Sequence, residues 1–222
     1  MRDAPSFSLE NQLGKNAIVF GIDEVGRAPL AGPVVAACVF IPEHRRNEDI
    51  WLEVRDSKAL SRKKRERLSP VIQSHSIWAI GSANIEEIEK LNIIQASLLA
   101  MKRAYVGCIK LTQSNNNPVA LVDGNQPPSL PCKVKTVIKG DAKSVSIAAS
   151  SIIAKVARDN LMIDLANSHP HFGWERNAGY PTKEHLEAIN EHGITPHHRK
   201  TFAPVSNYLE FGNVNRQIKF AI

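Results

Sequence analysis

The stretch that decides the fold of this chain reads Val19-Phe20-Gly21-Ile22-Asp23-Glu24-Val25-Gly26-Arg27-Ala28-Pro29-Leu30-Ala31-Gly32-Pro33-Val34-Val35. An apolar run leads into two adjacent acids and then into a glycine-rich turn that carries one arginine. A second apolar run follows at once. This pattern predicts a strand, a turn and a second strand, with Asp23 and Glu24 at the end of the first strand.

The two adjacent acids need an explanation. Consecutive strand residues point to opposite faces, so both acids serve one site only if the strand breaks there or if one offers its main-chain carbonyl. We expect Gly26 to supply the break, because glycine tolerates unusual backbone angles. The plain alternative is a solvent-exposed acidic turn in a hairpin. Two carboxylates at the end of an apolar strand are costly unless they are paired or bound to metal, which favours a site.

Length and composition are those of an ordinary globular protein. The 222 residues are 43% hydrophobic and 23% charged, and the sequence shows no internal repeat and no low-complexity linker. We therefore expect a flexible N-terminal tail over residues 1–14 and a single domain over residues 15–222. The formal charge of +6 favours a polyanionic partner without naming it.

The cysteines and the apolar runs bear on the cell compartment. Cys38, Cys108 and Cys132 have no paired spacing, which argues against a disulfide framework or a zinc knuckle and fits a reducing, cytoplasmic setting. Residues 1–15 are polar and predict no signal peptide. Since no apolar run approaches the length of a membrane span, we expect no membrane partner.

Two further apolar runs end in acids. Residues 119–122 lead into Asp123, and a strand over residues 133–138 leads into Asp141. In open α/β sheets, ligands gather at the carboxyl ends of the strands. Three strand ends that each deliver a carboxylate therefore predict one shared site.

Helices are predicted over residues 62–75, 85–91, 94–111, 144–166 and 183–192. The first of these carries the densest positive charge in the chain, which indicates either a solvated helix face or a nucleic-acid contact. In the fourth, Lys155 and Arg158 lie on the polar side. They are either phosphate contacts or ordinary surface charges.

The strand-end acids predict a metal site. Asp23, Glu24, Asp123 and Asp141 offer carboxylate oxygens, the ligands that Mg²⁺ and Mn²⁺ prefer. Two such ions would clamp the attacking water and the leaving oxygen of a phosphodiester without a covalent nucleophile. A rival zinc site would draw on His169, His171, His197 and His198. The cysteines are not placed to complete it, so we interpret these histidines as surface or phosphate-facing side chains without a catalytic role.

The stretch from Asp23 to Val34 resembles the signature of the type 2 ribonucleases H at all but one position, because Ala28 stands where the family has glycine. The resemblance continues in the family's order through Asp56-Ser57-Lys58, Val122-Asp123-Gly124, Lys139-Gly140-Asp141, residues 146–159, Gly179-Tyr180-Pro181-Thr182 and Glu184-His185. It implies a ribonuclease-H-like α/β fold. This is a five-stranded mixed sheet of three antiparallel strands and two parallel additions, flanked by helices, with a small helical C-terminal extension.

The resemblance also implies site residues. The catalytic and metal-binding acids would be Asp23, Glu24, Asp123 and Asp141. The substrate-binding residues would be Gly26, Arg27 and Ala28 in a recognition turn, Lys58 at the nucleic-acid backbone, and Tyr180. The implied activity is hydrolysis of the RNA strand of an RNA–DNA hybrid by a monomer. It includes incision 5′ of a single ribonucleotide in duplex DNA, which leaves a 3′-hydroxyl and a 5′-phosphate.

Two alternatives stay open. One is a nucleic-acid-binding member of the fold that cleaves weakly, which Ala28 favours and the four acids disfavour. The other is a resolvase-like or exonuclease activity, since a fold does not fix a function. Alanine in place of glycine is tolerable at negative φ and costly at positive φ. Because its methyl group would also stand against the ribose, we expect weaker recognition of an isolated ribonucleotide than in a glycine-bearing relative.

Overall fold

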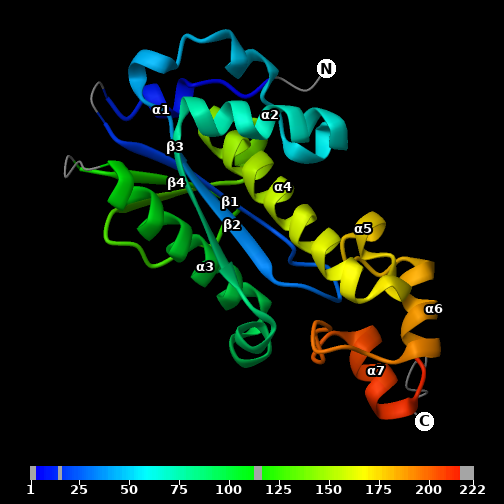
Figure 1. Ribbon diagram of the computed structural model, residues 1–222. Coiled ribbons are helices and arrows are strands. Elements are labelled where there is room, and N and C mark those ends of the chain that lie inside the picture. The colour runs from blue at the N-terminus through cyan, green and yellow to red at the C-terminus, as the bar shows by residue number, and fades with distance from the viewer. Residues whose placement is uncertain (1–3, 15–16, 113–116, 216–222) are drawn as a thin grey trace.

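The computed structural model describes residues 4–14, 17–112 and 117–215, so residues 1–3 of the expected tail lie outside it. The strands are β1 (Val19–Val25), β2 (Val34–Phe40), β3 (Ile77–Ala83), β4 (Val119–Asp123) and β5 (Lys133–Val137). The α-helices are α1 (Ser8–Asn11), α2 (Arg62–His75), α3 (Ile85–Thr112), α4 (Val145–Ser168), α5 (Trp174–Asn177), α6 (Lys183–His192) and α7 (Ala203–Phe211). Figure 1 shows the sheet between helices, with α5, α6 and α7 gathered at one end.

The five strands form one mixed sheet in the order β3-β2-β1-β4-β5. The pairs β1–β2 and β2–β3 are antiparallel, whereas β1–β4 and β4–β5 are parallel, which confirms the expected topology. In the parallel pair, Ile22 lies opposite Val122. Asp23 and Asp123 are the next residues along their strands, so this register sets them side by side at the same edge of the sheet.

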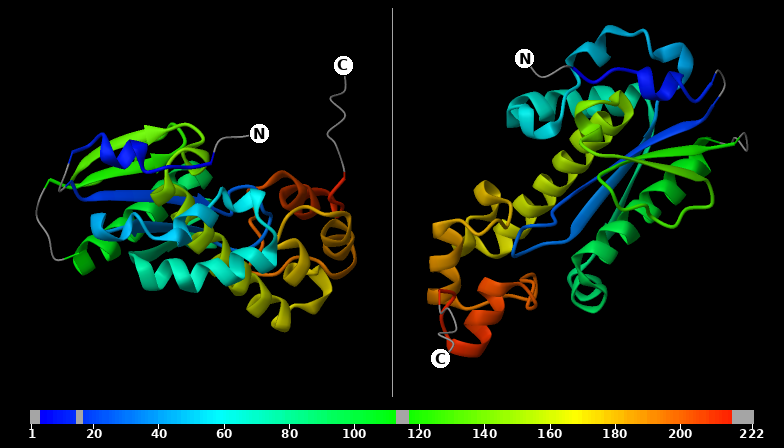
Figure 2. Two further views of the ribbon diagram at one scale, coloured as in Figure 1. Left: turned by 90° about the horizontal axis from the view of Figure 1, so that it is seen from above. Right: turned by 180° about the vertical axis from the view of Figure 1, so that it is seen from behind.

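Helices cover the two faces of the sheet separately. On one face, α3 packs against β2 and β3 and buries Phe20 and Ile22 of β1 around Tyr105. On the other face, α4 crosses β1 and β2, and α2 packs beside it. The two views in Figure 2 show these layers from above and from behind. Because side chains alternate along a strand, the residues of β1 on the α4 face are Val19, Gly21 and Asp23.

The expected flexible tail differs from what the structure shows for residues 4–14. Ser6 forms a bridge with Ser144, and Glu10 of α1 is only 1% exposed. The Glu10 carboxylate accepts hydrogen bonds from the Ser144 and Ser146 hydroxyls at 2.6 and 2.7 Å and from the Ser146 amide at 3.0 Å. A carboxylate is favoured at a helix N-terminus, where the first amides lack partners. The segment therefore fixes the start of α4.

The long helix α3 contains a kink where the sequence predicts a break between two helices. Asn92 has φ of 67° and ψ of 165°, and its side-chain oxygen accepts from the amides of Ile94 and Gln95 at 2.9 and 3.1 Å. Asparagine commonly caps a helix start in this way. The expected helices over 85–91 and 94–111 thus run on either side of the kink.

The C-terminal part has its own apolar cluster, which packs on the end of α4. Met162 and Ala166 of α4 meet Trp174, Ile189 and Val205 there. Across the described ranges, no helix combines the length and the apolar character needed to cross a membrane. Cys38, Cys108 and Cys132 are free thiols in this structure.

Candidate active site

Three carboxylates converge at one edge of the sheet. Asp23 comes from β1, Asp123 is the last residue of β4, and Asp141 lies in a 3-10 turn, Gly140–Ala142, between β5 and α4. One carboxylate oxygen of each lies within 4.8 Å of the others. The Gly140 amide donates to Asp123 Oδ1 at 2.6 Å, which ties the β4 acid to the turn that carries Asp141. The prediction that the acids at these three strand ends converge is therefore confirmed.

Glu24 lies at the margin of the trio. Strand β1 continues unbroken through Asp23 and Glu24, and the break at Gly26, with φ of 94°, comes only afterwards. The expectation of a break that turns both acids to one face is therefore wrong. Glu24 points with Ile22 toward the α3 face, where its carboxylate pairs with Arg27 at 3.3 Å. Its membership of the metal site remains a prediction.

Burial and the neighbouring carboxylates raise the pKa values of Asp23 and Asp141. Burial raises the pKa of Asp23 well above its usual range, and the neighbouring Glu24, Asp123 and Asp141 carboxylates raise it further. Burial, then Asp123 and Asp56, raises the pKa of Asp141 to about 6. Buried carboxylates that repel one another are stable as anions only beside a cation. All-oxygen donors of this kind suit Mg²⁺ or Mn²⁺, so the trio fits a divalent metal.

A fifth carboxylate and a lysine border the trio. Asp56 caps the 3-10 turn Ser57–Ala59 by accepting from the Lys58 amide at 2.9 Å, and its carboxylate adjoins that of Asp141. Burial lowers the pKa of Lys58, but Asp23, Asp56 and Asp141 more than offset this and leave it raised. Lys58 thus lies beside the acids, as a phosphate ligand would. Sequence reasoning missed Asp56, although it opens the Asp-Ser-Lys stretch.

The recognition turn projects from the same end of β1. Arg27 and Ala28 are exposed. Gly26 has φ of 94°, and a Cβ atom added there would also lie 2.2 Å from Arg158 Nε, so both the backbone angle and the space favour glycine. Ala28 is not among the described residues with positive φ, so alanine is unstrained at this position. Of the two cases that the sequence left open, the tolerable one therefore applies.

Two buried arginines lie beneath this turn, and sequence reasoning missed both roles. Arg158 is not on a polar face: it is fully buried, and it donates to the carbonyls of Ala31, Pro33 and Ala178. Arg199 is equally buried under the same turn. Burial lowers the pKa of Arg158 to about 10 and that of Arg199 to about 9, which leaves both charged at neutral pH.

Tyr180 lies on a loop that is hydrogen-bonded to the segment just after the recognition turn. The Leu30 amide donates to Gly179 O at 2.8 Å, and the Tyr180 side chain is 38% exposed beside it. His185 Nδ1 donates to Tyr180 O at 2.9 Å and holds the loop from below. The tyrosine ring is therefore free to meet a ligand while its backbone is fixed.

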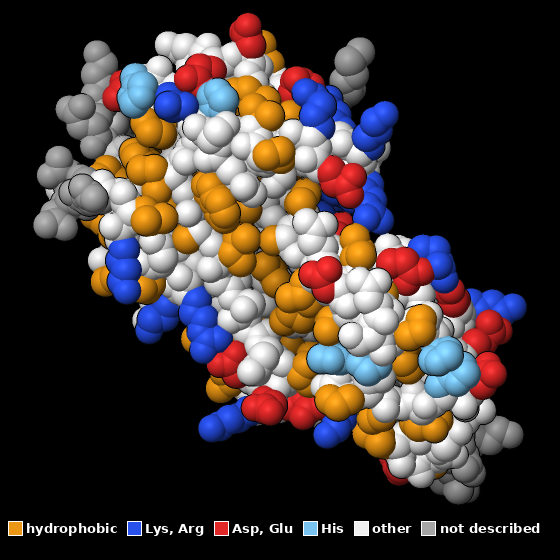
Figure 3. Space-filling view, viewed as in Figure 1, with side chains coloured by type: hydrophobic (Ala, Val, Ile, Leu, Met, Phe, Trp, Pro, Cys, Tyr) orange, Lys and Arg blue, Asp and Glu red, His pale blue; other side chains and the backbone are white. Residues whose placement is uncertain are grey.

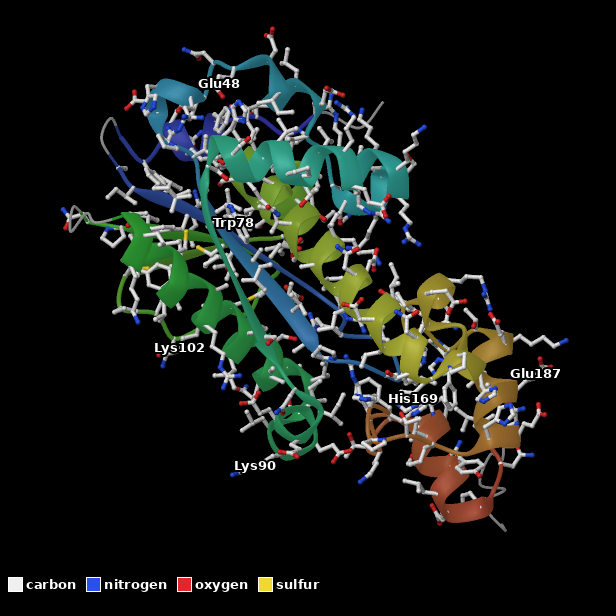
Figure 4. The ribbon with its side chains drawn as sticks, in the orientation of Figure 1. Glu48, Trp78, Lys90, Lys102, His169 and Glu187 are labelled. Carbon is white, nitrogen blue, oxygen red and sulfur yellow. The ribbon has the colours of Figure 1, made fainter. Side chains whose placement is uncertain are left out.

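The histidines form a packed aromatic cluster. His185 and His198 are fully buried, and Trp174 Nε1 donates to His185 Nε2 at 3.1 Å. Burial, and then His185, lowers the pKa of His198 to about 3, so it stays neutral. His169, labelled in Figure 4, stacks edge-on to Trp174 and His197. The interpretation of His198 as a surface group is wrong, and within the described ranges no histidine joins a metal-binding group.

Most of the basic side chains at the start of α2 form ion pairs, although they share three carboxylates. Figure 3 shows its blue side chains mixed with red ones. The ion pairs are Arg62–Glu66, Lys64–Glu53, Arg65–Asp159 and Arg67–Glu53. Most of this charge therefore belongs to an ion-paired surface, and Lys58 is the lysine that faces the acids.

The Asp141 carboxyl should make a contribution to the stability of the metal-free protein that falls as the pH rises from 3.8 to about 6. In this interval the folded state keeps a proton on Asp141, whereas the unfolded chain has released it. The folded state therefore binds more protons, and the free energy of unfolding falls as pH increases. Urea unfolding with a chelator, compared between the wild type and Asp141→Asn, isolates this carboxyl. The variant should show a shallower fall, and equal slopes would contradict the assignment.

Comparisons with known proteins agree on one family. The family model described as Ribonuclease HII matches residues 20–205. A ribonuclease HII from Paramagnetospirillum magneticum is 51% identical over 93% of this chain and its own full length. The ribonuclease H2 structure from Pyrococcus horikoshii OT3 matches with a TM-score of 0.67 and 25% identity, covering 87% of this chain and 98% of that one.

A ribonuclease HIII structure, Bst-RNase HIII in complex with Mn²⁺, shares the fold with a TM-score of 0.73 at 19% identity, over 94% of this chain and 74% of that one. The strand order, the acidic trio and the relatives lead to the same assignment. Such enzymes are metal-dependent endoribonucleases of the ribonuclease H type. This chain belongs to the ribonuclease HII family.

Proposed function

We propose that this ribonuclease hydrolyses the RNA strand of RNA–DNA hybrids and cuts 5′ of a ribonucleotide embedded in duplex DNA, leaving a 3′-hydroxyl and a 5′-phosphate. The observation that carries the proposal is the convergence of the Asp23, Asp123 and Asp141 oxygens within 4.8 Å of one another. This cluster lies beside an exposed turn and an exposed tyrosine. The weakly cleaving alternative gains no support, since all the acids are present and Ala28 is unstrained.

We assign Asp23, Glu24, Asp123 and Asp141 as the metal ligands, and Mg²⁺ or Mn²⁺ as the cofactor. When bound, two such cations lower the pKa of the attacking water and stabilise the leaving oxygen. Asp23, Asp123 and Asp141, which come from three chain segments, would fix the positions of the bound cations. Arg27 holds the Glu24 carboxylate at their margin. Lys58 adds a positive charge beside the acids, where a scissile phosphate needs one.

The recognition turn and Tyr180 select the substrate. A ribonucleotide differs from a deoxyribonucleotide by its 2′-hydroxyl, which is both a donor and an acceptor. The amides of the exposed residues Arg27 and Ala28 are donors of the right kind, and the exposed Tyr180 ring offers a stacking surface. We further propose that the protein acts as a monomer. We place it in the cytoplasm because its three thiols are free, as is usual in a reducing compartment.

Cleavage of three matched duplexes tests the proposal. An RNA–DNA hybrid and a DNA duplex with one ribonucleotide should be cut with Mg²⁺ or Mn²⁺, whereas the all-DNA duplex should stay intact. End-labelling should place the second cut 5′ of the ribonucleotide. Cutting of the all-DNA duplex would indicate a resolvase-like or exonuclease activity. Tight binding of the hybrid without cutting would indicate the weakly cleaving alternative.

Replacing Lys58 by Gln should weaken hybrid binding and make its salt dependence shallower. Loss of one phosphate contact should reduce the slope of log K against log salt by about 0.7–0.9. Binding titrations at several salt concentrations measure this slope. Lys63→Gln is the matched control, because it removes the same charge from an exposed position on α2 and should leave the slope nearly unchanged. An unaltered slope for Lys58→Gln would make Lys58 an ordinary surface charge.

Replacing Ala28 by Gly should raise cleavage of the single-ribonucleotide duplex by a few-fold. Backbone strain is absent. The gain would therefore come only from removing a methyl group that would stand against a bound ribose. The measurement is kcat/KM for both proteins on that duplex. An unchanged or lower value would show that the turn already accommodates alanine.

A further inference from the structure

Arg199 has an unusual set of partners for a fully buried guanidinium. Its Nη2 donates to Gly26 O at 2.6 Å and to Gly32 O at 2.7 Å, its Nη1 to Arg27 O at 2.9 Å, and its Nε to Gly32 O at 3.0 Å. Among the residues that the structure describes, no carboxylate pairs with it. Its charge is satisfied by the carbonyls of Gly26 and Arg27 in the recognition turn, by that of Gly32 and by the ring of Phe202, 5.0 Å away.

These bonds set the direction of the turn's amides. In a planar trans peptide the C=O and the following N–H point in opposite directions, and the described residues include no cis peptide. Arg199 draws the carbonyls of Gly26 and Arg27 inward. The amides of Arg27 and Ala28 must then point outward. Neither amide has an acceptor within the described part of the chain, and both residues are exposed.

Arg158 provides a contrast under the same turn. It too is fully buried and donates to three carbonyls, among them Ala31 O and Ala178 O. The amides that follow these carbonyls are already used: Gly32 donates to His197 O at 3.0 Å and Gly179 to Asn177 Oδ1 at 2.8 Å. Arg158 therefore supports the turn, but the amides that follow Ala31 O and Ala178 O are not free to donate to a ligand.

The segment that carries Arg199 is itself paired with the turn. The Arg199 amide donates to Leu30 O at 2.8 Å, and His198 forms an antiparallel bridge with Ala31. The C-terminal part thus contacts the β1–β2 connection through its backbone as well as through the Arg199 side chain. Arg199 lies 167 residues from Gly32 in the sequence, so local sequence patterns do not indicate this contact.

We infer that Arg199 is a positioning residue for ribonucleotide recognition: it holds the Arg27 and Ala28 amides outward as a pair of donors for the ribose 2′-hydroxyl. This inference rests on the proposed function. Arg199 is fully buried and its hydrogen-bond partners are carbonyls, so it acts through the direction of two peptide planes. Lysine has one compact ammonium and cannot span Gly26, Arg27 and Gly32 together.

The test compares Arg199→Lys with Arg158→Lys. Affinity is measured by fluorescence anisotropy for a DNA duplex with one ribonucleotide and for the identical all-DNA duplex, with a chelator present so that no strand is cut. The wild type should prefer the ribonucleotide, and Arg199→Lys should reduce this preference by about tenfold, equivalent to about 1.4 kcal/mol or one hydrogen bond. Arg158→Lys should weaken both affinities alike and keep the preference. A general loss of structure would also lower both affinities together, so only the ratio reports the role of Arg199.

Amide-resolved hydrogen exchange on the wild type keeps the test independent of how the variants fold. The Arg27 and Ala28 amides should exchange rapidly in the free protein. They should be protected by the ribonucleotide duplex more than by the all-DNA duplex. Equal protection by both duplexes would overturn the inference, and so would an equal change of preference in the two variants.

Cleavage and binding preference together separate a failure of the proposed function from a failure of the role of Arg199. If the wild type does not cleave the ribonucleotide duplex with Mg²⁺ or Mn²⁺, the proposed function is wrong. If the wild type cleaves it but shows no binding preference, or if Arg199→Lys keeps the full preference, the function stands and the role of Arg199 is wrong.

Discussion

Replacing Asp23 by Asn should reduce strand cleavage by a factor on the order of a thousand while leaving the fold intact. Electrostatic stabilisation of the transition state is the main catalytic contribution in such a site, and the loss of a single contributing group typically costs about a hundred- to a thousandfold. Asp23 lies beside Glu24, Asp123 and Asp141, so its charge is central to the cluster. Asparagine keeps the shape, and its oxygen still accepts from the Glu24 amide, as Asp23 Oδ1 does at 2.7 Å.

The same change should leave the metal-free protein at least as stable as the wild type. One of several mutually repelling buried carboxylates is removed, and no hydrogen bond is lost. Calorimetric titration with Mn²⁺ should show weakened binding, which separates loss of the cation from loss of the fold. Asp164→Asn on the exposed side of α4 is the matched control and should change neither rate nor metal affinity. A rate for Asp23→Asn within a few-fold of the wild type would remove Asp23 from the site.

Much of this site could be predicted because its signals are local. Apolar runs that end in Asp23 and Asp123 define two strand ends, and a parallel pairing brings such ends to one edge of a sheet. Because side chains alternate along a strand, Asp23 and Glu24 point to opposite faces of the sheet, and this too follows from local sequence. A glycine two residues beyond Glu24 suggested a break that the structure places after both acids.

The supporting contacts could not be predicted because their partners are remote. Helical spacing sets Arg158 on the less apolar side of α4, and nothing nearby indicates that carbonyls from residues 31–33 and 178 enclose it. Glu10 belongs to a segment without periodicity, and its partners are hydroxyls at the start of α4. Buried polar groups of this kind depend on tertiary placement, which residue patterns do not record.

Replacing Gly21 by Ala should destabilise the protein by roughly 3 kcal/mol, at the upper end of what overpacking usually costs. Gly21 lies in the middle of β1, where α4 begins to cross the sheet. A Cβ atom there would lie 2.1 Å from the Ser146 carbonyl carbon and 2.4 Å from the Ile147 amide nitrogen. These are backbone atoms, so no side-chain rotamer relieves the overlap and the helix itself must retreat. For a chain of this size, the melting temperature should fall by roughly 10 °C.

Gly212→Ala separates steric overlap from backbone strain. Gly212 has φ of 68° and nothing within 4 Å of an added Cβ, so alanine there carries only the cost of its backbone angles, about 1 kcal/mol. Gly21 has no positive φ, and its substitution carries only the overlap. Thermal unfolding of both variants should therefore show the larger loss for Gly21→Ala. A smaller loss than that of Gly212→Ala would mean that α4 can shift away from β1 at little cost.

Cleavage by Gly21→Ala should fall even at temperatures where the variant stays folded. Asp23 is two residues further along the same face of β1, and Asp141 lies in the turn that leads directly into α4. A retreat of α4 from Gly21 moves Asp141 away from Asp23, and carboxylates held by separate segments bind a cation only at the correct spacing. Mn²⁺ affinity should therefore fall together with the rate. A variant with reduced stability but unchanged Mn²⁺ affinity would show that the turn around Asp141 is held by β4 and Glu10 independently of the contact between β1 and α4.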